Sequence, residues 1–238
     1  MMVHIEFKRE DRQAFRFQTI TEKVASFLIR NNEYIHLFVH FLRDSYDYHA
    51  DKFHQRIQCY QERVRRKRAK GVSDEVYVSL LAELSAACRF DSDVNDLRGM
   101  LAEQIFQACI KKRGLGRDWK CSTGCSVWID GWLVRYISEP DGKSKMTVDL
   151  GAWCFNRQAG EFYEVKLSPY AFHAVDFGYL NMLHQSLESV GVSEYKIGIF
   201  SLDDKRLLQG RIQQLGYELL AKMQVLSLSD FLEDVQVG

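Results

Sequence analysis

Several common features are scarce or absent in this chain of 238 residues, and each absence excludes a class of protein. Only two prolines are present and no run is rich in glycine and serine, which argues against a long flexible linker. No stretch approaches the ~18 uninterrupted apolar residues of a membrane-spanning helix. The 32 basic and 32 acidic residues balance, so any basic surface that attracts nucleic acid has to be local.

Familiar catalytic and targeting motifs are missing as well. The chain has no Gly-x-Ser-x-Gly elbow of a serine hydrolase and no Gly-x-x-x-x-Gly-Lys phosphate-binding loop. Its first ten residues are too charged for a signal peptide, and the six cysteines are therefore expected to be reduced thiols in the cytoplasm. Cys121 and Cys125 form a C-x3-C pair, but no second pair stands at zinc-finger spacing, so free thiols are favoured over structural zinc.

The composition predicts a folded protein made of one large domain or two small ones. An apolar fraction of 46% with 13% aromatics is ample for a packed core. Residues 1–92 are predicted to be helical and to serve in dimerisation or in docking a protein partner or nucleic acid. Within them we expect a helix opened by a capping box at residues 19–22, one long helix over residues 33–70, and another over residues 74–88. Residues 93–238 are predicted to form a second domain.

The end of the long helix carries the only dense basic cluster of the chain. This basic cluster consists of Arg63, Arg65, Arg66, Lys67 and Arg68. Cations at the end of a helix complement its dipole, so the cluster is compatible with a solvated helix end. It is equally compatible with contacts to the phosphates of a nucleic acid. The sequence leaves both interpretations open.

Helical and strand-like segments alternate in the second domain. A helix begins at Asp93 or Asp96 and ends near Lys112, before Gly114. Asp130-Gly131 predicts a hairpin turn between two strands. The predicted strands cover residues 126–129, 132–137, 146–153, 161–167 and 195–202, and a helix covers residues 172–190. A helix over residues 203–215, a strand ending near residue 228 and a short helix from residue 229 follow.

Two carboxylates and a lysine stand on the two central strands of this pattern. Side chains alternate across a strand, so Glu164 and Lys166 share one face, and Asp149 on the preceding strand can face them. We expect the apolar residues of both strands to be buried on the opposite side. Such a group is suited to a hard divalent cation and an activated water. The competing interpretation is a solvated sheet face with cross-strand charge pairs.

The order of these elements, with the acidic motif inside it, resembles the PD-(D/E)xK nuclease superfamily, also called restriction-endonuclease-like. Glu164-Val165-Lys166 is a full E-x-K motif, while Val148-Asp149 stands where the family has Pro-Asp, so the proline is missing. Gly99 and Glu103 are similar to a glycine and a glutamate in the first helix of archaeal Holliday-junction resolvases. The resemblance covers roughly residues 93–202. It implies a mixed α/β (α+β) fold with an αβββαβ core.

The resemblance also implies a function and a set of site residues. A Mg²⁺ or Mn²⁺ ion is expected on Asp149, Glu164, the Val165 carbonyl and Glu103, with Lys166 orienting the attacking water. The expected activity is hydrolysis of phosphodiester bonds in DNA, in a subunit of a prokaryotic antiviral defence system. Two alternatives stay open: a nuclease that cleaves RNA, and a catalytically silent nuclease-like fold that serves as an interaction subunit.

Overall fold

The computed structural model describes residues 2–9, 15–45, 48–67, 72–138, 142–218 and 222–232. The chain divides into two compact units. The sheet unit contains Met1–Arg12 and Cys109–Gly238, and the helical unit contains Gln13–Ala108. This division differs from the predicted boundary between residues 92 and 93. The N-terminal strand joins the sheet, while most of the helix before the sheet groups with the preceding helices.

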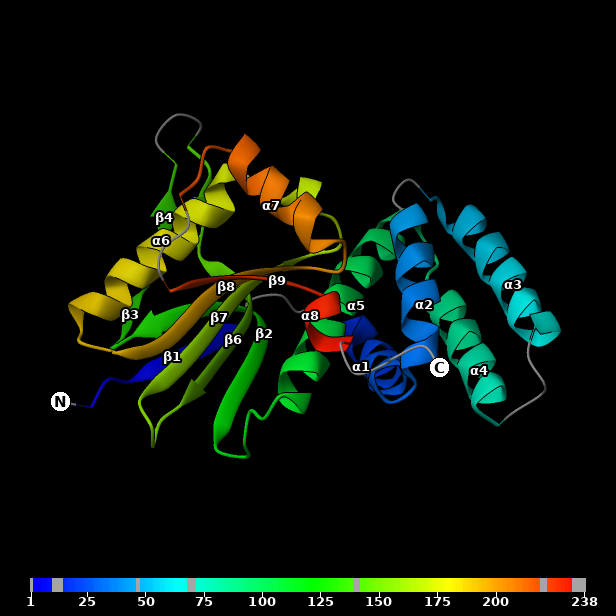
Figure 1. Ribbon diagram of the computed structural model, residues 1–238, viewed down its shortest axis with the longest axis horizontal. Coiled ribbons are helices and arrows are strands. Elements are labelled where there is room, and N and C mark those ends of the chain that lie inside the picture. Colours follow the sequence, from blue (N-terminus) through cyan, green and yellow to red (C-terminus); the bar gives the residue numbers. More distant parts are fainter. Residues whose placement is uncertain are drawn as a thin grey trace. The chain divides into compact units, whose positions relative to one another are not determined.

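A mixed β-sheet forms the centre of the sheet unit, which confirms the predicted mixed α/β class (Figure 1). Its strands are β1 (Ile5–Arg9), β2 (Trp119–Ile129), β3 (Trp132–Leu133), β6 (Thr147–Cys154), β7 (Ala159–Lys166), β8 (Glu194–Ser201) and β9 (Met223–Ser227). They lie in the order β1-β2-β6-β7-β8-β9, with β3 paired to β2. A separate two-stranded sheet pairs β4 (Tyr136–Ile137) with β5 (Ser144–Lys145).

The direction of each strand follows from its connection. Short turns join β2 to β3 and β6 to β7 as antiparallel pairs, and β2 also pairs antiparallel with β6 across the segment that contains β4 and β5. The predicted hairpin at Asp130-Gly131 is confirmed, because both residues have positive φ angles, 48° and 85°. The strand predicted over residues 132–137 is instead split between β3 and β4. Strand β8 pairs with β7 in parallel, since a helix connects the two, and β9 continues the parallel part.

Two helices cover one face of the sheet and bury its main apolar cluster. They are α6 (Ala174–Ser189) and α7 (Lys205–Gln214), and both lie over the same face in Figure 1. A 3-10 turn over Pro169–Ala171 precedes α6, so the helix begins two residues later than predicted. The cluster includes Phe162 of β7 and Ile199 of β8 together with Leu183 of α6. The short helix α8 (Ser229–Leu232) follows β9.

The helical unit contains α1 (Phe15–Arg30), α2 (Asn32–Asp44), α3 (Ala50–Lys67), α4 (Val72–Ala87) and most of α5 (Asp91–Lys112). The prediction of one helix over residues 33–70 is wrong, because α2 ends at Asp44 and α3 begins at Ala50. Asp91 accepts a hydrogen bond from the Ala50 N–H at 2.8 Å, which satisfies a free donor at the new helix start. The predicted capping box at residues 19–22 is also wrong, since these residues lie inside α1.

Candidate functional site

Asp149, Glu164 and Lys166 lie together at the end of β7, as the sequence predicts. The Lys166 Nζ is 2.7 Å from Asp149 Oδ2 and 3.4 Å from Glu164 Oε2. Strand register explains this convergence. Leu150 is paired with Tyr163, so Asp149 and Glu164 fall on the opposite face of the two strands from that pair. The two carboxylates therefore share one ammonium group.

The β6–β7 ladder ends next to this group. Its last pair is Leu150 with Tyr163, and beyond it the Asp149 carboxylate accepts the Val165 N–H at 2.8 Å. A side chain thus takes the place of a main-chain partner and holds the strand end. On the other side of β6, Gly124 stands opposite Asp149 in the register and has a φ of 52°. Most residues with a side chain adopt that conformation at a cost, so the backbone there favours a glycine.

Two further charged residues, which the sequence analysis missed, complete the cluster. The Lys145 Nζ of β5 lies 3.0 Å from Glu164 Oε2 and 3.1 Å from Asp176 Oδ1. Asp176 is in the first turn of α6, where it also accepts the His173 N–H at 2.8 Å. Lys145 stands four residues before Asp149 on a different strand, and no spacing rule connects them. Asp176 is recognisable in the sequence only as a helix-capping residue.

We call these five residues the charge cluster: Asp149, Glu164, Lys166, Lys145 and Asp176. It is largely buried, which contradicts the interpretation as a solvated sheet face. The Glu164 side chain is 0% exposed, and those of Asp149 and Lys145 are 16% and 15% exposed. The apolar residues expected on the opposite face, such as Leu150 and Tyr163, are buried as predicted. The face that carries the charges is not purely polar, however, since Phe162 of the apolar cluster shares it with Glu164.

Burial and charge give the two central carboxyl groups different proton affinities. Burial raises the pKa of Glu164 well above its usual range, and the nearby Asp149 charge raises it further. Burial acts in the same direction on Asp149. There the ammonium groups of Lys166 and Lys145 outweigh it, so the pKa of Asp149 is lowered. At Lys145 and Lys166, burial lowers the pKa, but the neighbouring carboxylates have the larger effect. The pKa values of both lysines are therefore raised.

Asp149 and Glu164 are two carboxylates, the type of ligand that a magnesium ion takes in proteins. Mg²⁺ is commonly held by one or two carboxylates, with water and substrate phosphate completing the shell. Glu164 Oε1 is buried and has no hydrogen-bond partner within the described part of the chain, so one oxygen is free for a ligand. Both contacts of Asp149 to Lys166 and Val165 fall on Oδ2. Among the described residues, no three His, Cys, Asp or Glu side chains are grouped to hold a metal.

The remaining predicted residues belong to other elements than these central strands. Glu103 is half-buried on α5 in the helical unit, so the sheet unit by itself does not contain this expected ligand. Arg63, Arg65 and Arg66 are exposed on α3, and Arg66 pairs with Glu62 at 3.2 Å. Lys67 ends α3, but its side chain lies outside the description. Arg68 lies outside the described residues altogether. Cys121 and Cys125 both lie on β2 as free thiols.

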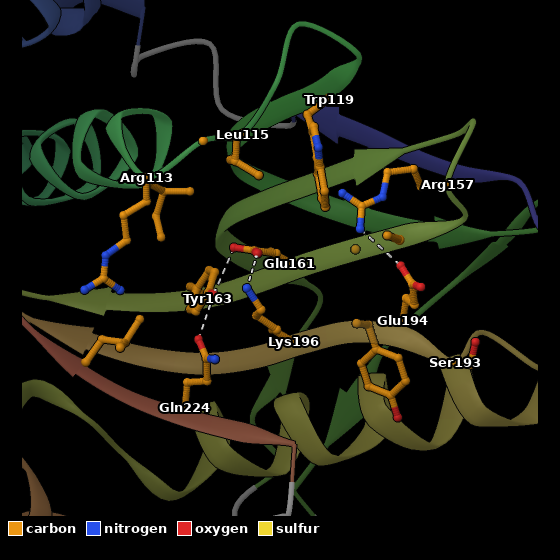
Figure 2. A pocket seen from close by; sticks show the side chains of 16 residues that line it. Arg113, Leu115, Trp119, Arg157, Glu161, Tyr163, Ser193, Glu194, Lys196 and Gln224 are labelled. Carbon is orange, nitrogen blue, oxygen red and sulfur yellow. Dashed lines mark hydrogen bonds and ion pairs between the residues drawn. The ribbon is translucent and has the colours of Figure 1, made fainter. Parts of the chain in front are cut away.

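A cavity of about 570 Å³ lies on the other face of β7 (Figure 2). Residues around it include Arg113, Trp119, Glu161, Tyr163, Lys196 and Gln224. Glu161 and Tyr163 alternate along β7 with Glu164 and Lys166, so they point to the opposite side. Glu161 accepts hydrogen bonds from Tyr163 at 3.0 Å and from Lys196 at 2.8 Å. The predicted site residues do not line this cavity.

Comparison of the chain with protein families, with curated proteins and with solved structures gives no match. Within the described residues, no helix is both long and apolar enough to cross a membrane.

Proposed function

We propose that the sheet unit is a divalent-metal-dependent nuclease that hydrolyses phosphodiester bonds in DNA. The observation that carries this proposal is the placement of Asp149, Glu164 and Lys166. The carboxylates of two neighbouring strands lie within 3.4 Å of the Lys166 ammonium nitrogen, and one buried Glu164 oxygen has no hydrogen-bond partner among the described residues. Two acidic groups and a lysine in this arrangement are suited to an ion and a reacting phosphate.

The order of elements supports a restriction-endonuclease-like core as part of the same proposal. The last residues of α5 lead into the antiparallel strands β2, β6 and β7, and α6 then connects β7 to the parallel strand β8. This order is compatible with an αβββαβ core when β2, β6 and β7 are taken as its three strands. Asp149 stands on the second of them, and Glu164 with Lys166 on the third, as the resemblance implies.

Each residue has a distinct role under this proposal. Asp149 and Glu164 hold the ion, which supplies a Lewis acid and a bound water of lowered pKa. The N–H and C=O of a strand residue point to the same side, so the Val165 carbonyl faces the Asp149 side chain that accepts its N–H. This carbonyl is the proposed third ligand. Lys166 stabilises negative charge that develops on the phosphate, as a preorganised cation in a site of low water content.

A second proposal is a nuclease-like fold without catalytic activity. It is favoured by the two lysines, whose ion pairs with the Glu164 carboxylate already supply counter-charges to that group. In that case the charge cluster only stabilises the fold, and the helical unit binds a partner. Metal affinity distinguishes the two proposals. The nuclease is expected to bind a divalent ion, whereas a purely structural cluster is not.

The experiment is a cleavage assay with the purified chain on circular DNA, linear DNA and RNA of matched length. Each substrate is incubated with Mg²⁺, with Mn²⁺ or with EDTA. The proposal predicts DNA cleavage in either metal and none in EDTA. Cleavage of the linear DNA alone identifies an exonuclease. Cleavage of RNA alone identifies RNA, instead of DNA, as the substrate. No cleavage of any substrate, together with no binding of Mn²⁺ by calorimetry, contradicts the proposal.

A further inference from the structure

Lys145 is a second lysine in the charge cluster, and it reaches the cluster from a separate element. It ends β5, whose hairpin with β4 packs on α6 through Tyr136, directly against Gly178. Its ammonium lies 3.0 Å from Glu164 and 3.1 Å from Asp176, and its side chain is only 15% exposed. The β4–β5 hairpin therefore places the buried Lys145 ammonium beside Glu164, the carboxylate that Lys166 also contacts.

The charges of the cluster are matched to a phosphodiester once a divalent ion is present. Three carboxylates and two ammonium groups carry one net negative charge when all are ionised. A bound divalent ion changes this to one net positive charge. A phosphodiester carries a single negative charge and would neutralise the group. Without Lys145, the same site with its ion would be neutral and would offer no net attraction to the phosphate.

Within the described part of the chain, Lys145 also has a donor left for a ligand. An ammonium group has three N–H donors, and the contacts of Lys145 to Glu164 and Asp176 account for two of them. An ion on Glu164 would weaken the pull of that carboxylate on Lys145, whereas Asp176 would continue to hold it. Asp176 is itself fixed by the His173 N–H at the start of α6. The ammonium is thereby held next to Glu164, a proposed ligand of the ion.

We infer that Lys145 binds a nonbridging oxygen of the substrate phosphodiester, and that Asp176 is the residue that positions it. This inference rests on the proposed function. It assigns the phosphate contact to a residue outside the E-x-K motif and on a different element. A buried ion pair by itself is no gain in stability over well-packed apolar residues, so a purely stabilising role does not account for a lysine at this position.

The test measures steady-state DNA cleavage and Mn²⁺ affinity in matched variants. Lys145→Gln should raise KM and lower kcat/KM by about tenfold or more, the effect of losing one charged hydrogen bond. Its Mn²⁺ affinity, measured by calorimetry on the protein alone, should be unchanged or higher, because a cation next to Glu164 has been removed. Lys143→Gln is the control, since Lys143 is exposed on the same hairpin, and should behave like the wild type.

A second pair of variants keeps the test decisive if Lys145→Gln fails to fold. Asp176→Asn leaves Lys145 in place without its anchor and should also raise KM with Mn²⁺ affinity retained, while Asp176→Glu should restore the wild-type KM. Unchanged KM in both Lys145→Gln and Asp176→Asn overturns the inference, as does loss of Mn²⁺ binding in Lys145→Gln. A wild type that neither binds Mn²⁺ nor cleaves DNA overturns the proposed function, and the inference with it.

Discussion

At Glu164, burial disfavours the ionised carboxylate that the proposed metal site requires. Its side chain is fully buried, and its raised pKa means that the folded state holds the proton more tightly than the unfolded chain does. Ionised Glu164 is therefore unfavourable unless cations surround it. Under the proposed function, a divalent ion would add to the two lysines and provide that compensation, so that a carboxyl group is tolerated at this position.

Glu164→Gln should change the dependence of stability on pH in metal-free buffer. Glutamine mimics the protonated acid. The stabilising contribution of protonated Glu164 is fully present below the unfolded pKa of about 4.3 and is lost as pH rises through the higher folded pKa. The free energy of unfolding of the variant, minus that of the wild type, should rise with pH by up to about 1.4 kcal/mol per unit in this window. Urea unfolding with EDTA at several pH values measures it, and parallel curves would contradict the raised pKa.

Lys166→Met should lower the turnover number about 100-fold or more, with little effect on Mn²⁺ affinity, because its charge acts on the transition state. Lys196→Met is the matched control. Lys196 lies on the neighbouring strand, where it pairs with Glu161 on the opposite face of the sheet. The control should keep the wild-type turnover. Equal turnover in Lys166→Met and the wild type would leave Lys166 as a structural ion-pair partner.

Among the secondary-structure elements, the β4–β5 hairpin connects the fold to the site. Tyr136 of β4 lies against Gly178 of α6, where a methyl group would overlap its ring. Replacing a helical glycine by alanine normally stabilises a protein by up to about 1 kcal/mol, but here the ring or the hairpin has to move. Since β4 is paired with β5, such a movement would also displace Lys145.

Gly178→Ala should therefore destabilise the protein by about 1–3 kcal/mol and raise KM for DNA in the manner of Lys145→Gln. Gly210→Ala is the control, because Gly210 lies in α7 with nothing within 4 Å of an added methyl group. Thermal unfolding and steady-state kinetics of the two variants give the comparison. A Gly178→Ala protein as stable and active as Gly210→Ala would show that the contact with Tyr136 does not position the hairpin.

Local signals predicted most of the elements but only part of the site. Alternation, the Asp130-Gly131 turn and Pro169 located the strands and turns around Glu164 within a few residues. They also placed Asp149, Glu164 and Lys166 on one face. Lys145 and Asp176 were not predictable in this way, since their contacts depend on a short irregular hairpin and on how α6 packs. Strand β1 was missed too, because its pairing with β2 joins residues more than a hundred positions apart.

At the scale of the whole molecule, the basic cluster and the charge cluster belong to different units. The helical unit has its own aromatic core, in which the ring centroids of Tyr34 and Tyr77 lie 4.6 Å apart. The buried Tyr34 hydroxyl also donates a hydrogen bond to Asp74. The sequence pattern placed the boundary between the two units before α5, because α5 was predicted to be the first helix of the nuclease-like core. Most of α5 instead groups with the helical unit, as shown by the buried Arg98 bonded to the Leu42 carbonyl.

Neutralising part of the basic cluster tests whether the helical unit contacts nucleic acid. Arg65→Gln combined with Arg66→Gln should weaken DNA binding without regard to sequence. The slope of log affinity against log salt should fall by up to about 2 units, one for each lost phosphate contact. A Lys23→Gln, Arg30→Gln double variant on α1 removes the same charge and serves as the control. Equal slopes in the two variants would assign the cluster to solvent or to a protein partner.

The most direct measurement of the central claim is Mg²⁺-dependent cleavage of circular DNA by the wild type and by the double variant Asp149→Asn, Glu164→Gln. The substitutions preserve side-chain size and remove both proposed ligand charges, and circular dichroism verifies that the variant is folded. We predict cleavage by the wild type that stops with EDTA, and no cleavage or Mn²⁺ binding by the folded variant. Cleavage by the variant at the wild-type rate would contradict a metal-dependent nuclease site at these residues.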